Sequence, residues 1–149
     1  MACPGPSEMT TASSGFPGGT YRISRAENEE LCAAVGAVPD PEGWAHPIFY
    51  YIATQVGMGL SVAELLAKCD FDVADGPLMV GSNATFHQQL KVDLTYEVSG
   101  QIDSLVRKPS RAFGAMDLLT FTLKLTEGGT PVLTCTNQWV LPRRGGSEA

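Results

Sequence analysis

The pattern of apolar and polar positions changes once along the chain, and the stretch from His46 to Lys68 is its most distinctive part. The stretch has the length of a helix, and its apolar side chains point in nearly every direction around a helical wheel. They are Ile48, Phe49, Tyr50, Tyr51, Ile52, Val56, Met58, Leu60, Val62, Leu65 and Leu66. A helix that is apolar on every side is buried on most of them. We therefore expect one long buried helix ending near Cys69, with gaps at Gly57 and Gly59 where another backbone comes close.

From Leu78 onward the period of the pattern becomes that of a strand. Apolar residues alternate with polar ones over residues 90–99 and again over 119–126, which predicts strands with one buried face. Residues 102–106 are expected to continue the sheet. Residues 107–114 are expected to form a loop.

Local signals place four further elements. Glu127-Gly128-Gly129-Thr130 is a hairpin turn signal, and Val132–Val140 is the expected return strand. Nearer the N-terminus, Tyr21–Ser24 is a short strand candidate. Arg25–Val35 has helical spacing, with Ser24 as its N-cap and acidic residues in the early turns.

The order of the elements predicts the fold class. Residues 1–18 are rich in Pro, Gly, Ser and Thr and are expected to be a flexible leader, and residues 144–149 a disordered tail. Residues 19–143 then form one α+β domain, in which an antiparallel sheet wraps around a long central helix. This is the hotdog arrangement. Because a lone hotdog leaves a sheet edge exposed, we expect two of them to pair as a double hotdog.

Three stretches of the chain carry a resemblance to a known family. Ala45-His46-Pro47-Ile48-Phe49 resembles the family's helix-opening segment, and Phe86-His87-Gln88-Gln89-Leu90 with Val92-Asp93-Leu94-Thr95-Tyr96 resembles its histidine-bearing strand. Gly128-Gly129-Thr130-Pro131-Val132 resembles its last hairpin. In this order the stretches are similar to the MaoC-like branch of the hotdog superfamily, over about residues 20–143. The resemblance implies an (R)-specific enoyl-CoA hydratase or 3-hydroxyacyl-thioester dehydratase.

The segment before the central helix departs from the family pattern. Catalytic members carry an Asp and a His in a D-x-N-P-x-H-x-D segment, whereas residues 38–46 here are short and lack the N-P-x-H core. Asp40 and His46 are the nearest equivalents, one residue further apart than the family's pair. Some members of the family are non-catalytic subunits that shape the acyl-binding tunnel of a heterodimer, and this chain resembles those as well.

The chemistry implied by the resemblance selects the candidate site residues. Hydration of an enoyl thioester needs an activated water, and an Asp40–His46 pair at the helix N-terminus is the candidate for holding and deprotonating it. Backbone N–H groups at the same helix terminus suit the developing enolate oxygen. Candidate substrate contacts are Phe49, Tyr50, Ser82, Asn83 and His87. Most of these candidates have an ordinary structural interpretation as well. His46 can be satisfied locally at the helix N-terminus, Asp40 can belong to turn chemistry, and Tyr50 can serve core or dimer packing. Ser82 and Asn83 can be ordinary strand residues, and His87 can face solvent or pack at the edge of a core.

Two other groups of residues give alternatives. Thioesterases of the same superfamily use a carboxylate on the central helix, and Glu64 is the candidate for that role, unless it reaches solvent near the helix end. Arg107, Lys108 and Arg111 either meet CoA phosphates or belong to a solvated loop. No separate cofactor is implied, because the substrate itself carries CoA or phosphopantetheine.

The composition of the chain limits the classes of partner that it is expected to bind. The formal net charge is −6, which argues against a nucleic-acid partner. The four cysteines show no CxxC spacing, so no zinc site is expected, and reduced thiols in a cytoplasmic protein are the simplest interpretation. No continuous apolar run reaches the length of a membrane span. The expected partners are an acyl-CoA or an acyl carrier protein thioester, and a second hotdog subunit in a homodimer or a heterodimer with another MaoC-like chain.

Overall fold

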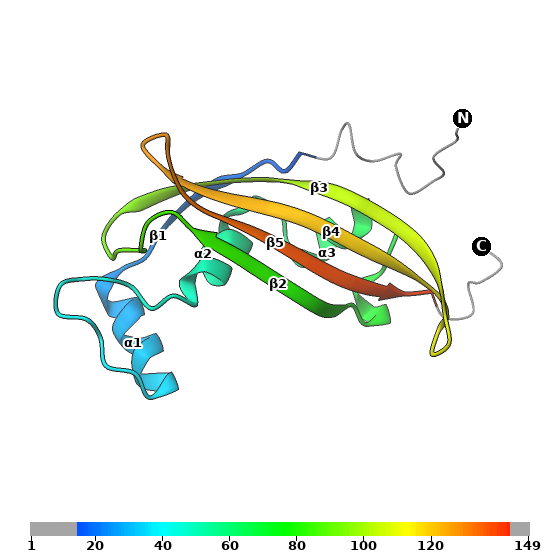
Figure 1. Cartoon of the computed structure of the whole chain (residues 1–149), viewed down its shortest axis with the longest axis horizontal. Coiled ribbons are helices and arrows are strands. Elements are labelled where there is room, and N and C mark those ends of the chain that lie inside the picture. Colours follow the sequence, from blue (N-terminus) through cyan, green and yellow to red (C-terminus); the bar gives the residue numbers. More distant parts are fainter. Residues whose placement is uncertain (1–14, 144–149) are drawn as a thin grey trace.

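The computed structural model describes residues 15–143 and shows one strongly curved antiparallel sheet with helices on its concave side (Figure 1). The strands are β1 (Gly19–Arg22), β2 (Leu78–Phe86), β3 (Thr95–Ser110), β4 (Gly114–Glu127) and β5 (Thr130–Pro142). Their order across the sheet is β1-β3-β4-β5-β2. Within the described residues, the two edges of the sheet are therefore the short β1 and the longer β2.

The sheet confirms the predicted hairpin and corrects the predicted strand limits. β4 and β5 meet at Gly128 and Gly129, both with positive φ. The expected loop at 107–114 is wrong over its first part, because Arg107 lies in β3 and pairs with Asp117 of β4. The strand expected over 90–99 begins only at Thr95, since the chain turns at Asp93, which has a φ of 66°.

α1 (Arg25–Val35) has the predicted bounds and cap. The Ser24 hydroxyl accepts a hydrogen bond from the backbone N–H of Glu27 at 3.0 Å. The helix ends where Gly36 adopts a left-handed conformation with a φ of 76°, which glycine accepts without a steric penalty. Both helix ends are thus specified by local sequence.

The single long helix expected after His46 is wrong, because the chain forms two helices there. These are α2 (Phe49–Gly57) and α3 (Val62–Lys68), followed by a short 3-10 turn, η2 (Val73–Asp75). Gly59 has a φ of 85° and breaks the helix, and a Cβ at this position would lie 2.5 Å from the carbonyl oxygen of Gly18. Ser61 then caps α3. The segment is also not covered on all sides within this chain, since Val56 remains 65% exposed.

The close backbone approach expected at Gly57 is confirmed. A Cβ there would lie 2.6 Å from Cγ2 of Val98, so only glycine lets α2 settle this closely on β3. The backbone of β1 is equally near, because a Cβ at Gly19 would lie 2.9 Å from the carbonyl oxygen of Gly57. The end of α2 is therefore held against two strands.

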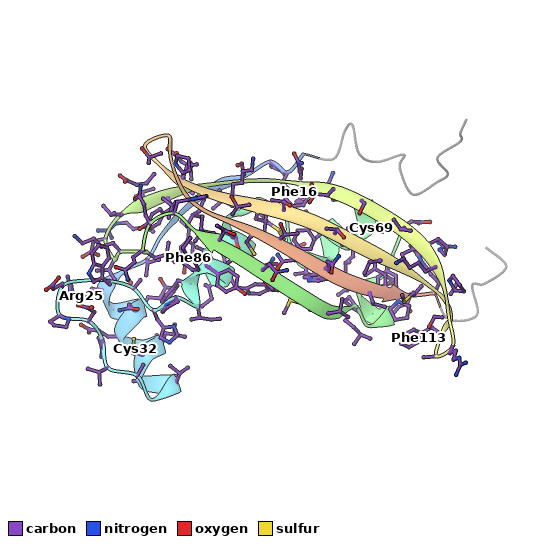
Figure 2. All side chains as sticks on the ribbon, viewed as in Figure 1. Phe16, Arg25, Cys32, Cys69, Phe86 and Phe113 are labelled. Atoms are coloured by element: carbon purple, nitrogen blue, oxygen red, sulfur yellow. The ribbon has the colours of Figure 1, made fainter. Side chains whose placement is uncertain are left out.

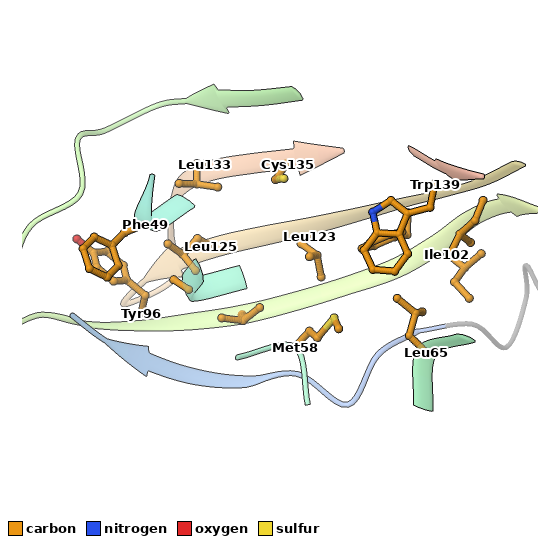
Figure 3. Packing of buried hydrophobic residues seen from close by; sticks show 14 of the residues in the cluster. Phe49, Met58, Leu65, Tyr96, Ile102, Leu123, Leu125, Leu133, Cys135 and Trp139 are labelled. Carbon is orange, nitrogen blue, oxygen red and sulfur yellow. The ribbon is translucent and has the colours of Figure 1, made fainter. Parts of the chain in front are cut away.

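The hydrophobic core lies between the helices and the concave face of the sheet (Figure 3). Leu133, Cys135 and Trp139 of β5 lie beside side chains from β4, with Met58 and Leu65 on the helical side. The rings of Phe121 and Trp139 pack edge to face with centroids 5.3 Å apart. This packing fixes the inner face of β5, on which part of the candidate site lies.

Two further observations concern the ends of the domain and the membrane. Residues 15–18 were expected to belong to the flexible leader, but they lie against the sheet. Phe16 donates its N–H to the carbonyl oxygen of Gly100 at 2.9 Å, and its ring packs on Phe121. Residues 1–14 and 144–149 lie outside the described residues. No helix within 15–143 has both the length and the apolar character needed to cross a membrane.

Candidate functional site

The start of α2 is held beside the segment that follows β2. The N–H of Ala45 donates to the carbonyl oxygen of Leu90 at 2.8 Å, and the N–H of Val92 donates to that of Gly43 at 2.9 Å. The ammonium group of Lys91 lies 5.2 Å from the centre of the Trp44 ring. This short pairing brings residues 86–90 next to the first turn of α2, although they are far away in the sequence.

His46 lies just before α2, two residues ahead of the N-cap residue Ile48. Its backbone N–H donates to Oδ1 of the buried Asn28 at 2.9 Å, which ties the turn to α1. Its Nδ1 accepts a hydrogen bond from the backbone N–H of Ile48 at 3.1 Å. A ring nitrogen that accepts a hydrogen bond carries no proton, so the neutral ring carries its proton on Nε2. His46 therefore presents a hydrogen-bond donor, not a base, to anything that approaches Nε2.

Asp40, the predicted partner of His46, is engaged elsewhere. Its side chain is exposed, and Oδ1 accepts a hydrogen bond from the backbone N–H of Glu42 at 2.7 Å. This is an Asx turn, the structural interpretation that the flanking prolines allowed. Within residues 15–143 no hydrogen bond joins Asp40 to His46, so the structure does not assemble the predicted dyad.

A small apolar pocket opens next to His46. It has a volume of about 200 Å³ and is lined by Ala45, Pro47, Phe86, Gln89 and Leu90. Two of these residues flank His46 in the sequence, and three come from the end of β2 and the segment that follows it. Figure 2 shows Phe86 at the end of the sheet nearest α2. The pocket has the character of a site for an apolar group held near a polar helix terminus.

A hydrogen-bonded row of side chains runs inward from Phe86. The Tyr50 ring packs edge to face on Phe86 at 6.2 Å, and its hydroxyl lies 2.9 Å from Oγ of Ser82. Ser82 donates in turn to Oδ1 of Asn137 at 2.6 Å, and Cys135 lies beside both. Two of the predicted substrate contacts, Tyr50 and Ser82, are thus brought together by the fold.

The other predicted contacts are placed apart from this row. Phe49 is 1% exposed and belongs to the core. Asn83 pairs with Thr136 and, being the residue after Ser82, faces the opposite side of the sheet. His87 is exposed, and its N–H donates to the carbonyl oxygen of Val132 at 2.7 Å. His87 is not among the residues that line the pocket.

Glu64 and the basic cluster also have structural partners. Glu64 is exposed, and with Ser61 it forms a capping box in which its Oε1 accepts from the N–H of Ser61 at 2.8 Å. Arg107 forms an ion pair with the buried Asp117, and hydrogen bonding to this carboxylate raises the pKa of the guanidinium. Lys108 and Arg111 are exposed.

Asp117 is also the centre of a second polar cluster, at the far end of the sheet. Arg143 donates to Oδ2 of Asp117 at 3.0 Å and to the carbonyl oxygens of Asp70 and Cys69 at 2.5 and 2.7 Å. It lines a cleft of about 510 Å³ between α3 and η2. Burial, and after it the nearby Asp117, raises the pKa of the Cys69 thiol to about 11. We assign this cluster a structural role, because its donors and acceptors satisfy one another.

The fold defined by these elements, one antiparallel sheet curved around a helical segment, is the hotdog fold, as the sequence predicted. Two similar solved structures are complexes from Mycobacterium tuberculosis. The ChsH1-ChsH2 complex matches at 15% identity over 92% of this chain and 94% of that chain, with a TM-score of 0.72. The HadBC (3R)-hydroxyacyl-ACP dehydratase complex matches at 17% identity over 85% and 93%, with a TM-score of 0.57.

A thioesterase fold is similar as well. A probable thioesterase from Bartonella henselae matches at 13% identity over 85% of this chain and 90% of that chain, with a TM-score of 0.53. No protein-family model and no curated protein matches this sequence. The comparisons therefore establish the fold and leave the reaction to be argued from the site.

Several residues of the site were not anticipated from the sequence. They are Asn28, Ala45, Pro47, Phe86, Gln89, Leu90 and Asn137. Asn137 had a usable signal, since it interrupts the apolar alternation of the last strand at an inward position. The five pocket residues lie in the two stretches, 45–49 and 86–90, that carry the family resemblance, but only the pairing of 43–45 with 90–92 brings these stretches together.

Proposed function

We propose that this chain is a MaoC-like hotdog subunit that binds acyl thioesters and takes part in interconverting (R)-3-hydroxyacyl and trans-2-enoyl groups, with a partner subunit supplying the catalytic dyad. The single observation that carries the proposal is the separate engagement of the predicted pair. His46 Nδ1 accepts from Ile48, and Asp40 Oδ1 accepts from Glu42. In this arrangement Nδ1 of His46 is engaged and Nε2 carries the proton, so the imidazole is not available to deprotonate a water held beside it.

The same geometry supports a binding role for His46. Its Nε2–H is a donor next to an apolar pocket, at a helix terminus whose N–H groups also favour a partial negative charge. A thioester carbonyl is an acceptor attached to an apolar chain, so it matches both features. In this role His46 orients and polarises the carbonyl, and a proton-abstracting group must come from another chain.

The free edge of the sheet supports an assembly. β2 is an edge strand of nine residues, and Leu78, Met79 and Val80 on it are 47%, 53% and 57% exposed. A long apolar edge strand promotes unwanted pairing unless a specific partner covers it. We propose that β2 pairs with the matching edge of a second hotdog subunit. Two of the similar structures, ChsH1-ChsH2 and HadBC, are complexes of two named components, which supports a heterodimer.

Two alternative functions have less support from the structure. A hydratase that acts alone requires Asp40 and His46 to work as a pair, and no hydrogen bond within residues 15–143 joins them. A thioesterase that uses Glu64 requires a carboxylate near the acyl pocket, whereas this one caps α3 at an exposed position. Neither alternative accounts for the present hydrogen bonds of its key residues.

Binding to the full-length chain tests the proposal. Calorimetric titration with octanoyl-CoA should show saturable binding at one site per chain. The Gln89→Trp substitution adds bulk at the pocket and should weaken binding about tenfold or more, equivalent to about 1.4 kcal/mol. The matched control is Gln88→Trp, since Gln88 is an exposed neighbour that is not among the pocket residues. Absence of binding, or an equal effect of the two substitutions, would overturn the proposal.

A further inference from the structure

The inner face of β5 carries one polar interruption that the proposed function does not use. Inward positions on this strand hold Leu133, Cys135, Asn137, Trp139 and Leu141. Asn137 is fully buried, with 0% exposure, and Trp139 is 5% exposed. Within residues 15–143, Nδ2 of Asn137 and Nε1 of Trp139 have no hydrogen-bond partner.

Two such atoms on adjacent inward positions are unusual. A buried polar group without a partner costs about 1–3 kcal/mol, and native proteins leave few of them. Turning the Asn137 amide by half a turn exchanges its oxygen and nitrogen and still leaves one polar atom without a partner. Figure 3 shows the indole nitrogen of Trp139 on the side of the ring facing Cys135, which is also the direction of Asn137 along the strand. The two nitrogen atoms without a partner, Nδ2 of Asn137 and Nε1 of Trp139, therefore lie in the same small region of the inner face.

The inner face of β2 runs from this region to Phe86, which lines the pocket beside His46. Phe86, Ala84 and Ser82 are successive inward positions of β2, paired with Leu133, Cys135 and Asn137 of β5. A strand rises by about 3.3 Å per residue, so Ser82 lies roughly 13 Å along β2 from Phe86. Ala84, between them, has the smallest side chain of the three. Tyr50 contacts both ends of this stretch, through its ring on Phe86 and its hydroxyl on Ser82, so an acyl chain that reaches Asn137 must displace the Tyr50 side chain.

We propose that Asn137 and Trp139 bind an oxygen atom carried on the acyl chain of the substrate, remote from the thioester. The inference rests on the proposed function, because the thioester end must lie at the pocket next to His46. A hydroxyl or carbonyl oxygen accepts from both Nδ2 of Asn137 and Nε1 of Trp139, and the Tyr50–Ser82 hydroxyl pair makes the approach polar on one side. This chain thereby favours oxygenated acyl groups over plain fatty chains of the same length.

The test compares two thioesters that differ by one oxygen, ω-hydroxydodecanoyl-CoA and dodecanoyl-CoA, titrated against the full-length chain. The wild type should bind the hydroxylated thioester about threefold to tenfold more tightly, the range expected for one net hydrogen bond. Asn137→Leu removes the amide at nearly constant volume, and Trp139→Phe removes only the indole N–H while keeping an aromatic ring. Each should bring the affinity ratio close to one with little change for dodecanoyl-CoA.

A matched control lies on the other face of the same strand. Thr136→Val removes a hydroxyl that contacts Thr122 at 3.2 Å, and it should leave the ratio unchanged. Equal affinities of the wild type for the two thioesters would overturn the inference and leave the proposed function standing, with buried water then satisfying the two nitrogens. Failure to bind either thioester would overturn both. If Asn137→Leu does not fold, the affinity ratios measured for Trp139→Phe and Ser82→Ala test the inference in its place.

Discussion

Nδ1 of His46 lies 3.1 Å from the backbone nitrogen of Ile48, the N-cap residue of α2, and accepts its hydrogen bond. The contact makes a prediction about stability that is independent of any reaction. His46→Ala removes the acceptor and should lower the free energy of unfolding by about 1 kcal/mol, the net contribution of one intramolecular hydrogen bond. His46→Asn offers an amide oxygen at a similar position and should retain most of that stability. Urea denaturation of both variants checks this, and equal losses would refute the contribution of this hydrogen bond.

Asp117 is 3% exposed and joins two arginines at the far end of the sheet. Asp117→Asn leaves their charges uncompensated and should destabilise the fold by less than the roughly 3–5 kcal/mol of a fully buried ion pair, because both arginines are partly exposed to solvent. Arg143→Met should cost more than Arg107→Met, because Arg143 also binds two backbone carbonyls and is less exposed, at 17% against 41%. Chemical denaturation of the three variants measures the order. A larger loss from Arg107→Met would contradict this assignment.

The Cys69 thiol predicts how stability depends on alkaline pH. Its pKa is raised from 9.0 to about 11, mainly by burial, so the folded chain retains this proton at pH values where the unfolded chain has lost it. The stabilisation is complete below the unfolded value and is lost as pH rises through the folded one, by about 1.36 kcal/mol for each unit. Unfolding free energies of the wild type and Cys69→Ala, measured from pH 9 to 11, should converge as pH increases. Parallel curves would show that this thiol does not contribute.

Gly57 and Val98 form a close contact that a double-mutant cycle can test. A Cβ at residue 57 would lie 2.6 Å from the Val98 side chain, so Gly57→Ala should destabilise the fold even though alanine favours helices. Overpacking of this kind costs about 1–3 kcal/mol. Val98→Ala should relieve it, so the double variant should be more stable than the sum of the single effects predicts. Strict additivity in thermal or urea unfolding would mean that the contact does not limit the packing.

The features predicted correctly from the sequence are those with local causes. The bounds of α1 follow from the Ser24 cap and Gly36, and the β4–β5 hairpin follows from two adjacent glycines. The break at Gly59 depends on the approach of Gly18, a tertiary contact that helical periodicity does not reveal. For the same reason, the apolar pattern of residues 46–68 predicts one helix where the chain forms two.

In the candidate site, too, features with local causes can be predicted from the sequence, and features set by tertiary contacts cannot. His46 was located because a helix start is a local signal, but the Asx turn that engages Asp40 competes with the dyad and prevails in the fold. Ser82 and Asn137 are separated by 55 positions, so their hydrogen bond appears only once β2 lies against β5. The pocket likewise depends on residues 43–45 pairing with 90–92.

Hydration of crotonyl-CoA by the isolated full-length chain tests the central claim most directly. The loss of absorbance of the enoyl thioester should stay at the uncatalysed rate, and activity should appear only when the chain is co-expressed with a neighbouring MaoC-like gene product. Asp40→Asn should behave like Asp72→Asn, a matched control whose carboxylate caps a backbone N–H in the same way at 2.9 Å. Rapid hydration by the isolated chain that is abolished by Asp40→Asn and by His46→Ala, and kept in Asp72→Asn, would contradict the account.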